Sequence, residues 1–195
     1  MDELNNLTKE SYFGEIGLSR QQYEERVALA DDLETVVLFM YNLLDNVDTL
    51  SAIAIATMVA ENYVNVVSKY VEVDEYIRAY AVYVANSLVE ATLNNKGKEY
   101  YTSYKRAVFV ACEEAQAVFN HTDHTKALKQ GKTKKQWVDK KDWVERESHR
   151  EVGSKIIDIN KPFLVGDSLM MHPKDRSMGA DAKEIINCRC RIRYL

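Results

Sequence analysis

The sequence predicts an α+β protein, in which an N-terminal all-α domain of about four long helices is followed by a small, loop-rich α+β domain. The chain of 195 residues holds only two prolines and seven glycines, a composition that favours helices over a turn-rich β fold. Apolar residues recur at helical spacing through most of the first 130 residues. Both prolines follow Gly131, where short apolar segments and loops begin. We therefore assign residues 1–130 to the helical domain and residues 131–195 to the second domain.

Four helices are expected in the first domain, at about residues 20–46, 49–70, 75–93 and 99–130. A capping-box pattern at Ser19–Gln22 precedes the first helix. Asp48 and Asp74 are candidate N-caps of the second and third helices. The histidines of HTDHTK, His121 and His124, suggest a break in the fourth helix. Long helices joined by short links are typical of a packed helical domain.

The second domain is expected to alternate short strands, short helices and loops. Its predicted elements are a strand at about 132–138, a helix at 143–151, an extended segment at 156–159, a loop-rich segment at 161–180, a helix at 182–186 and a final strand. Asp142 and Glu145 form the N-cap pattern of the first of these helices, and Gly153 stands where a C-terminal glycine is expected. Arg146 follows Asp142 by four residues, so the two side chains are expected to pair on this helix.

Charge divides the chain into an acidic part and a basic part. Residues 1–120 carry 9 Lys and Arg against 19 Asp and Glu, whereas residues 121–195 carry 17 against 11. The resulting net charges of −10 and +6 indicate two parts with different partners. No uncharged apolar run reaches the length of a membrane span, and the acidic N-terminus is unlike a secretory signal peptide, so no membrane partner is expected. Three cysteines, an odd number, do not suggest a disulfide framework.

The C-terminal segment EIINCRCRIRYL alternates with a period of two. A strand would place on one face a set of side chains that are expected to be buried, namely Cys188, Cys190, Ile192 and Tyr194. The opposite face would be a cationic stripe suited to contacts with phosphate or carboxylate groups, made of Arg189, Arg191 and Arg193.

His149, Cys188 and Cys190 are candidate metal ligands, and zinc is the metal that such a set would bind. The Cys-x-Cys spacing is shorter than in most structural zinc sites, and a fourth ligand would have to come from His172, Asp142 or elsewhere. Plain burial in the core is the favoured interpretation, because free cysteine is among the most buried residue types. Redox chemistry of the two thiols is a further alternative.

Catalysis by a cysteine is another alternative for the same residues. Either thiol could act as nucleophile with His149 and Asp142, which are seven residues apart and would share a helix face. His121 and His124 could bind a metal at i, i+3 spacing, although a solvated helix break is the favoured interpretation. The sequence contains no glycine-rich phosphate loop, HExxH or GxSxG motif. No catalytic residue is therefore assigned; convergence of His149 and both thiols on an open pocket would argue against that view.

From about Glu114 to its C-terminus, the chain resembles the phage head morphogenesis family, the phage Mu protein F-like minor head proteins. The motifs that carry the resemblance occur in the family's order, at Trp137, Asp142, Arg146, Ser148, His149, Gly153, Pro162–Phe163, Pro173, Asp175, Asn187, Cys188, Arg189 and Cys190. Upstream, Glu114, Phe119 and Asn120 also match. The family's Arg-Thr pair is replaced here by Cys112 and Glu113. The first 100 residues match no family that we can name.

The resemblance implies a non-enzymatic minor head (capsid) protein of a tailed bacteriophage. Such a protein would associate with the portal and other head proteins, act in head morphogenesis, and lie in the virion interior after assembly in the host cytoplasm. The resemblance leaves open whether the protein binds DNA and whether it takes part in DNA packaging or ejection. No cofactor is expected, with zinc as the exception named above. The alternatives are a metal-binding His/Cys nuclease or toxin-type effector packaged in the phage head, and a helical scaffold that only holds other capsid parts.

Overall fold

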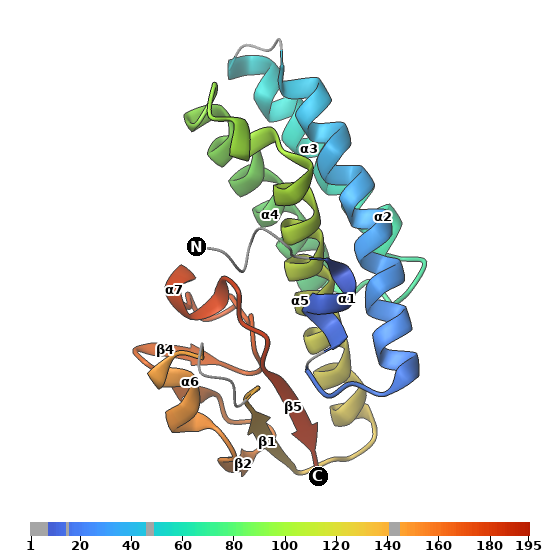
Figure 1. Cartoon of the computed structure of the whole chain (residues 1–195). Coiled ribbons are helices and arrows are strands. Elements are labelled where there is room, and N and C mark those ends of the chain that lie inside the picture. Colours follow the sequence, from blue (N-terminus) through green and yellow to red (C-terminus); the bar gives the residue numbers. More distant parts are fainter. Residues whose placement is uncertain (1–7, 15, 46–48, 141–144) are drawn as a thin grey trace. The chain divides into compact units, whose positions relative to one another are not determined.

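Figure 1 shows the computed structural model, which describes residues 8–14, 16–45, 49–140 and 145–195. The fold is α+β, as predicted, and the chain forms two compact units. A helical unit comprises Met1–Ser11 and Gln21–Ala115, and a C-terminal unit comprises Tyr12–Arg20 and Gln116–Leu195. The boundary predicted at residue 130 lies at the end of a helix that contributes to both units.

The predicted helices are present in the described part of the chain. The elements before the first strand are α1 (Lys9–Gly14), α2 (Arg20–Leu44), α3 (Thr49–Val67), α4 (Glu75–Asn94), the 3₁₀ helix η2 (Glu99–Thr102) and α5 (Tyr104–Lys129). Asp74 caps α4 as expected, because its carboxylate accepts the Ile77 N–H at 2.9 Å. Asp48 lies outside the described residues. The break suggested at His121 and His124 is wrong, since α5 is continuous there.

Two short helical elements were not predicted. α1 has six residues, too few to show a helical period. η2 occupies Glu99–Thr102, where the fourth helix was expected to begin, and α5 begins only at Tyr104. The fourth predicted helix therefore begins five residues later than expected. The hydroxyl of Ser103, between η2 and α5, accepts the Arg106 N–H at 3.2 Å, which gives α5 a local start signal.

One apolar core holds the helical unit together. Figure 1 shows α2, α3 and α4 as long helices lying side by side, and they bury alanine, valine and larger side chains together with the first part of α5. Arg106 is buried in the same unit, where its guanidinium donates to the hydroxyls of Tyr41 at 3.1 Å and Thr92 at 3.0 Å. These bonds meet the requirement that a buried charge be solvated by polar partners. None of the described helices has the length and hydrophobicity needed to cross a bilayer.

The C-terminal unit contains a three-stranded antiparallel sheet and a separate hairpin. The sheet has the order β2 (Ile156–Asp158), β1 (Lys134–Val138), β5 (Arg191–Tyr194), and the hairpin joins β3 (Phe163–Val165) to β4 (Ser168–Met170). Within the sheet, Trp137 lies opposite Ile192. The segment 161–180, predicted to be loop-rich, thus contains two short strands, which turn at Gly166 with a positive φ of 56°.

Two short helices flank these strands. They are α6 (Glu147–Val152) and α7 (Ala182–Ile185). The helix predicted at 143–151 is shifted, because Arg146 is the extended N-cap residue of α6. Arg146 precedes the helix, and its guanidinium donates to the Ile186 carbonyl. The expected pairing of Arg146 with Asp142 stays a prediction. Asp142 itself lies outside the described residues.

Gly153 ends α6 as predicted, but for a different reason. Its φ is −52°, so it does not adopt the left-handed conformation of the usual C-terminal glycine. A Cβ atom at this position would lie 2.8 Å from the Asp139 carboxylate and 2.9 Å from the Arg150 carbonyl oxygen. Glycine is needed here because the chain leaves no room for a side chain.

Candidate functional site

His149, Cys188 and Cys190 converge in the core of the C-terminal unit. Nδ1 of His149 lies 3.3 Å from the Cys190 sulfur and 3.6 Å from the Cys188 sulfur. One ligand atom from each residue lies within 4.8 Å of the others. All three side chains are buried, with at most 4% of the surface of any of them exposed. The favoured interpretation as core cysteines is right about burial, but the convergence on His149 argues against packing as their only role.

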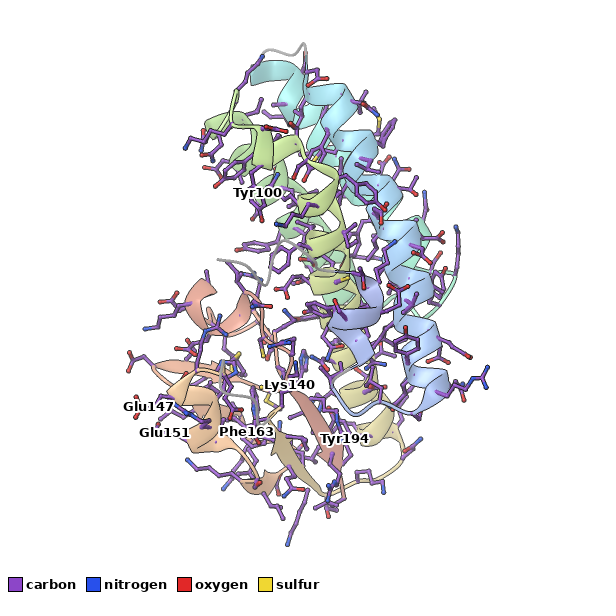
Figure 2. The ribbon with its side chains drawn as sticks, in the orientation of Figure 1. Tyr100, Lys140, Glu147, Glu151, Phe163 and Tyr194 are labelled. Carbon is purple, nitrogen blue, oxygen red and sulfur yellow. The ribbon has the colours of Figure 1, made fainter. Side chains whose placement is uncertain are left out.

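Local structure explains how these three side chains meet. His149 faces inward from α6, whereas Glu147 and Glu151 lie on the outer side of the helix, as Figure 2 shows. After α7, Asn187 adopts a positive φ of 56°, which asparagine tolerates better than most residues. The Cys188 N–H donates to the Ile185 carbonyl at 3.1 Å, which closes the turn and directs the chain toward α6. The final strand therefore begins at Arg191, later than predicted, and both cysteines precede it.

A buried carboxylate lies on the other side of the imidazole. Oε2 of Glu184 lies 3.2 Å from His149 Nε2 and accepts the Ser148 hydroxyl at 2.7 Å. Gly166 packs so closely on this carboxylate that a Cβ there would lie 2.7 Å from Oε1. Ser148 therefore bonds to a side chain and holds the carboxylate in place. Glu184 was not identified from the sequence, since its contacts span 36 residues and no spacing signals them.

The charges of these groups depend on one another. The pKa of Cys188 falls well below its usual value because Cys190 and His149 hydrogen-bond to it. The pKa of Cys190 rises correspondingly, because it bonds to Cys188 and is buried next to that charge. Burial alone would lower the pKa of His149, but the contact with Cys188 raises it overall. These contacts therefore favour the thiolate form of Cys188 and the protonated form of His149.

The cluster lines a small cavity. This cavity has a volume of about 100 Å³ and is bordered by the three candidate ligands together with Lys140, Glu145, Arg146, Asn187 and Arg189. A larger groove of about 490 Å³ lies between α3 and α4 in the helical unit, but its lining of alanine, valine and scattered polar side chains brings no cysteine or histidine together. Of these two cavities, the small one is therefore the candidate site for metal binding or cysteine chemistry.

The other residues considered as ligands lie elsewhere or cannot be placed. His172 does not approach the cysteines; its ring packs on those of His121 and His124, with centroids 5.6 and 5.7 Å apart. These three histidines, together with buried Lys135, form a second polar cluster in the C-terminal unit. Asp142, named both as a ligand and as a partner of a cysteine nucleophile, is outside the described residues.

Several of the remaining motif residues brace loops. Asn120 donates its side-chain N–H to the Pro173 carbonyl at 3.1 Å. The Asp175 carboxylate accepts the backbone N–H groups of Met171 and Ser177 at 2.9 and 2.8 Å. In the helical unit, Glu114 accepts the Tyr63 hydroxyl at 3.4 Å. The contacts of Asn120 and Asp175 replace the regular hydrogen bonds that loops lack, whereas Glu114 links α5 to α3.

The three C-terminal arginines do not form a uniform stripe. Arg193 is exposed on β5, and Arg189 is partly buried at the rim of the small cavity. Arg191 is also partly buried, and its Nε donates to the Ile16 carbonyl at 3.0 Å. Arg191 therefore ties the segment before α2 to the final strand, and of these three arginines Arg193 alone is exposed.

The sequence was also compared with known protein families. The family described as "Phage Mu protein F like protein" matches residues 61–193. The chain belongs to the phage Mu protein F-like family. No curated protein and no solved structure matches this Mu F-like chain significantly. The match begins within α3 and continues into β5, so it includes His149, both C-terminal cysteines and Glu184.

Proposed function

We propose that this Mu F-like protein is a non-enzymatic minor head protein of a tailed phage, which associates with the portal during head assembly and lies inside the capsid. The observation that carries the proposal is the family match over residues 61–193. The loop-bracing contacts of Asn120 and Asp175 support an architectural role for much of the motif. A part in DNA packaging or ejection belongs to the same proposal.

The division of charge supports two different kinds of contact. The first 120 residues carry a net charge of −10, which would repel DNA and favours a protein partner. The remaining residues carry +6, and in the C-terminal unit Arg193 is exposed on a strand. Arginine suits phosphate groups because its planar guanidinium can donate two parallel hydrogen bonds. We therefore assign DNA phosphates to the basic part and the portal to the acidic part.

Removal of Arg189 and Arg193 is expected to weaken DNA binding in a salt-dependent way. In the double variant Arg189→Ala/Arg193→Ala, the slope of log K against log salt concentration should become shallower by about 0.9 for each phosphate that the protein no longer neutralises. Fluorescence anisotropy with a labelled DNA duplex at several salt concentrations measures this slope. The matched control, Lys69→Ala/Lys96→Ala, removes the same charge from exposed positions of the helical unit and should leave the slope unchanged. Equal slopes for both double variants would contradict a DNA contact at these arginines.

Association with the portal is tested separately. When the full chain is co-expressed with the portal protein of the same phage, the two are expected to elute together as a complex that is larger than either component alone. Size-exclusion chromatography with light scattering would measure the mass of this complex. An unrelated ring-forming protein serves as the control for nonspecific binding. Separate elution, combined with absence of the chain from purified procapsids, would rule out the proposed role.

A further inference from the structure

The spacing of the three buried donors fits a zinc ion. Zinc–sulfur bonds of about 2.3 Å and zinc–nitrogen bonds of about 2.0 Å, at tetrahedral angles, place nitrogen and sulfur about 3.5 Å apart. The two distances from His149 Nδ1 to the sulfurs are 3.3 and 3.6 Å. Both nitrogen–sulfur distances therefore match those expected around a single tetrahedral ion.

We propose that His149 Nδ1, Cys188 Sγ and Cys190 Sγ bind one Zn²⁺ ion in the C-terminal unit. The fourth coordination position faces the cavity of about 100 Å³, which has room for a water molecule. Two thiolates balance the charge of the ion, so the ion together with its three ligands carries no net charge. Soft thiolate ligands select zinc over magnesium or calcium, which prefer oxygen.

The surroundings of His149 support this assignment independently of the sulfur atoms. Imidazole ligands of metals usually direct their second nitrogen to a carboxylate or a carbonyl, which fixes the ring and its tautomer. Here that nitrogen, Nε2, lies 3.2 Å from Glu184 Oε2, at ion-pair distance but without hydrogen-bond alignment. Glu184 is itself held by the Ser148 hydroxyl and by the close approach of Gly166. Glu184 therefore lies where the carboxylate partner of a metal-bound histidine is expected.

A zinc ion at this position would connect parts of the unit that have little regular structure between them. His149 comes from α6, whereas both cysteines come from the turn between α7 and β5. Binding requires both thiols to lose their protons, so it releases protons and weakens at acidic pH. The inference concerns stability of the fold and does not depend on the proposed role in phage assembly.

Metal content and a cobalt spectrum test the proposal on the full chain. Protein produced without a polyhistidine tag and in zinc-supplemented medium is expected to contain about one zinc per chain by elemental analysis. Metal-free protein titrated with Co²⁺ should develop a thiolate-to-cobalt charge-transfer band and visible bands of tetrahedral Co²⁺. Zinc should raise the midpoint of thermal unfolding. Absence of zinc together with absence of the thiolate band, or a disulfide between Cys188 and Cys190 in freshly purified protein, would overturn the proposal.

Variants distinguish the proposed ligands from other buried groups. Cys190→Ala should abolish the thiolate–cobalt band, whereas Cys112→Ala, which removes the buried thiol of the helical unit, should leave one zinc per chain. Because Cys190→Ala could unfold the unit, Glu184→Gln provides a near-isosteric second test. We expect it to keep the cobalt spectrum but to lower zinc affinity by about 10–100-fold in competition with a chelator. Unchanged affinity in Glu184→Gln would contradict the supporting role of the carboxylate, and loss of zinc in Cys112→Ala would contradict the ligand assignment.

Discussion

Acidification from pH 7 to pH 4.5 is expected to destabilise the folded protein by about 5 kcal/mol through His124 and His172. Both imidazoles are buried, with 6% and 2% of their surfaces exposed. Burial lowers the pKa of His124 to about 3 and that of His172 to about 4, and buried Lys135 adds to both effects. Both side chains are therefore mainly neutral in the folded protein throughout this range.

The direction of the effect follows from the two pKa values of each group. In the unfolded chain a histidine titrates near 6.5, so below that pH the unfolded state binds a proton that the folded state does not. The stability contributed by the neutral imidazoles is complete above pH 6.5 and declines as the pH falls toward the folded-state values. Each histidine then accounts for a loss of about 2.5 kcal/mol between pH 7 and pH 4.5.

Other charged groups near the two rings do not reverse this prediction. Asp175 lies near His172, and its pKa is lowered overall despite its burial, because His172 and two backbone N–H groups stabilise the carboxylate. Its own contribution to stability is also lost on acidification, mainly below pH 4. Lys135 has a pKa lowered to about 8, so it titrates above the acidic range. Further titratable neighbours among the described residues are His121 and Asp123 on α5, Tyr194 on β5, and Asp158, which lies near Lys135.

Urea denaturation at intervals between pH 7 and pH 4.5 would measure the change in the free energy of unfolding. His124→Gln and His172→Gln, each of which keeps a polar side chain but cannot be protonated, should each reduce the pH dependence by about half. Absolute stability at pH 7 is a separate readout, because either variant can disturb the packing of the rings. If the variant with both substitutions keeps the full pH dependence, the loss of stability at acidic pH comes from groups other than His124 and His172.

The helices of this chain were largely predictable from the sequence. α2, α3, α4 and α5 each contain many turns, so apolar residues recur often enough to reveal the period and the buried face. The Asp74 cap was also predictable, because it depends on a hydrogen bond between residues three positions apart. The hairpin of β3 and β4 was missed although Gly166 and Asp167 form a recognisable two-residue turn, since strands of three residues give little alternation.

The candidate site was only partly predictable. His149, Cys188 and Cys190 could be named as metal-ligand types, but their spacing does not show that they meet. The contribution of Glu184 depends on tertiary contacts with His149 and Ser148, which no local pattern encodes. The helix break suggested at His121 and His124 failed for a similar reason. Packing against His172 keeps these weak helix formers inside α5, and tertiary contacts override local preference.

Replacement of Trp137 by alanine is expected to destabilise the C-terminal unit by about 3–5 kcal/mol. Trp137 is completely buried on β1. Its ring makes edge-to-face contacts with Phe163 and His149, with centroids 5.3 and 5.8 Å apart. Figure 2 shows Phe163 inside the same unit. The core around these rings is completed by Val152, Val165, Met170, Ile185, Cys188 and Cys190. Truncation would leave a large cavity next to the proposed zinc ligands.

The comparison of Trp137→Ala with Trp137→Phe separates packing from hydrogen bonding. The indole nitrogen of Trp137 interacts with the Cys190 thiol but does not reach good hydrogen-bond geometry with it. Phenylalanine should therefore lose mainly part of the buried volume. We expect Trp137→Phe to cost about 1–2 kcal/mol, well below the cost of the alanine variant. Denaturation of metal-free protein measures both values, so that zinc does not mask the loss. Equal costs for the two variants would mean that the indole acts through a polar contact, since a packing effect must scale with the volume removed.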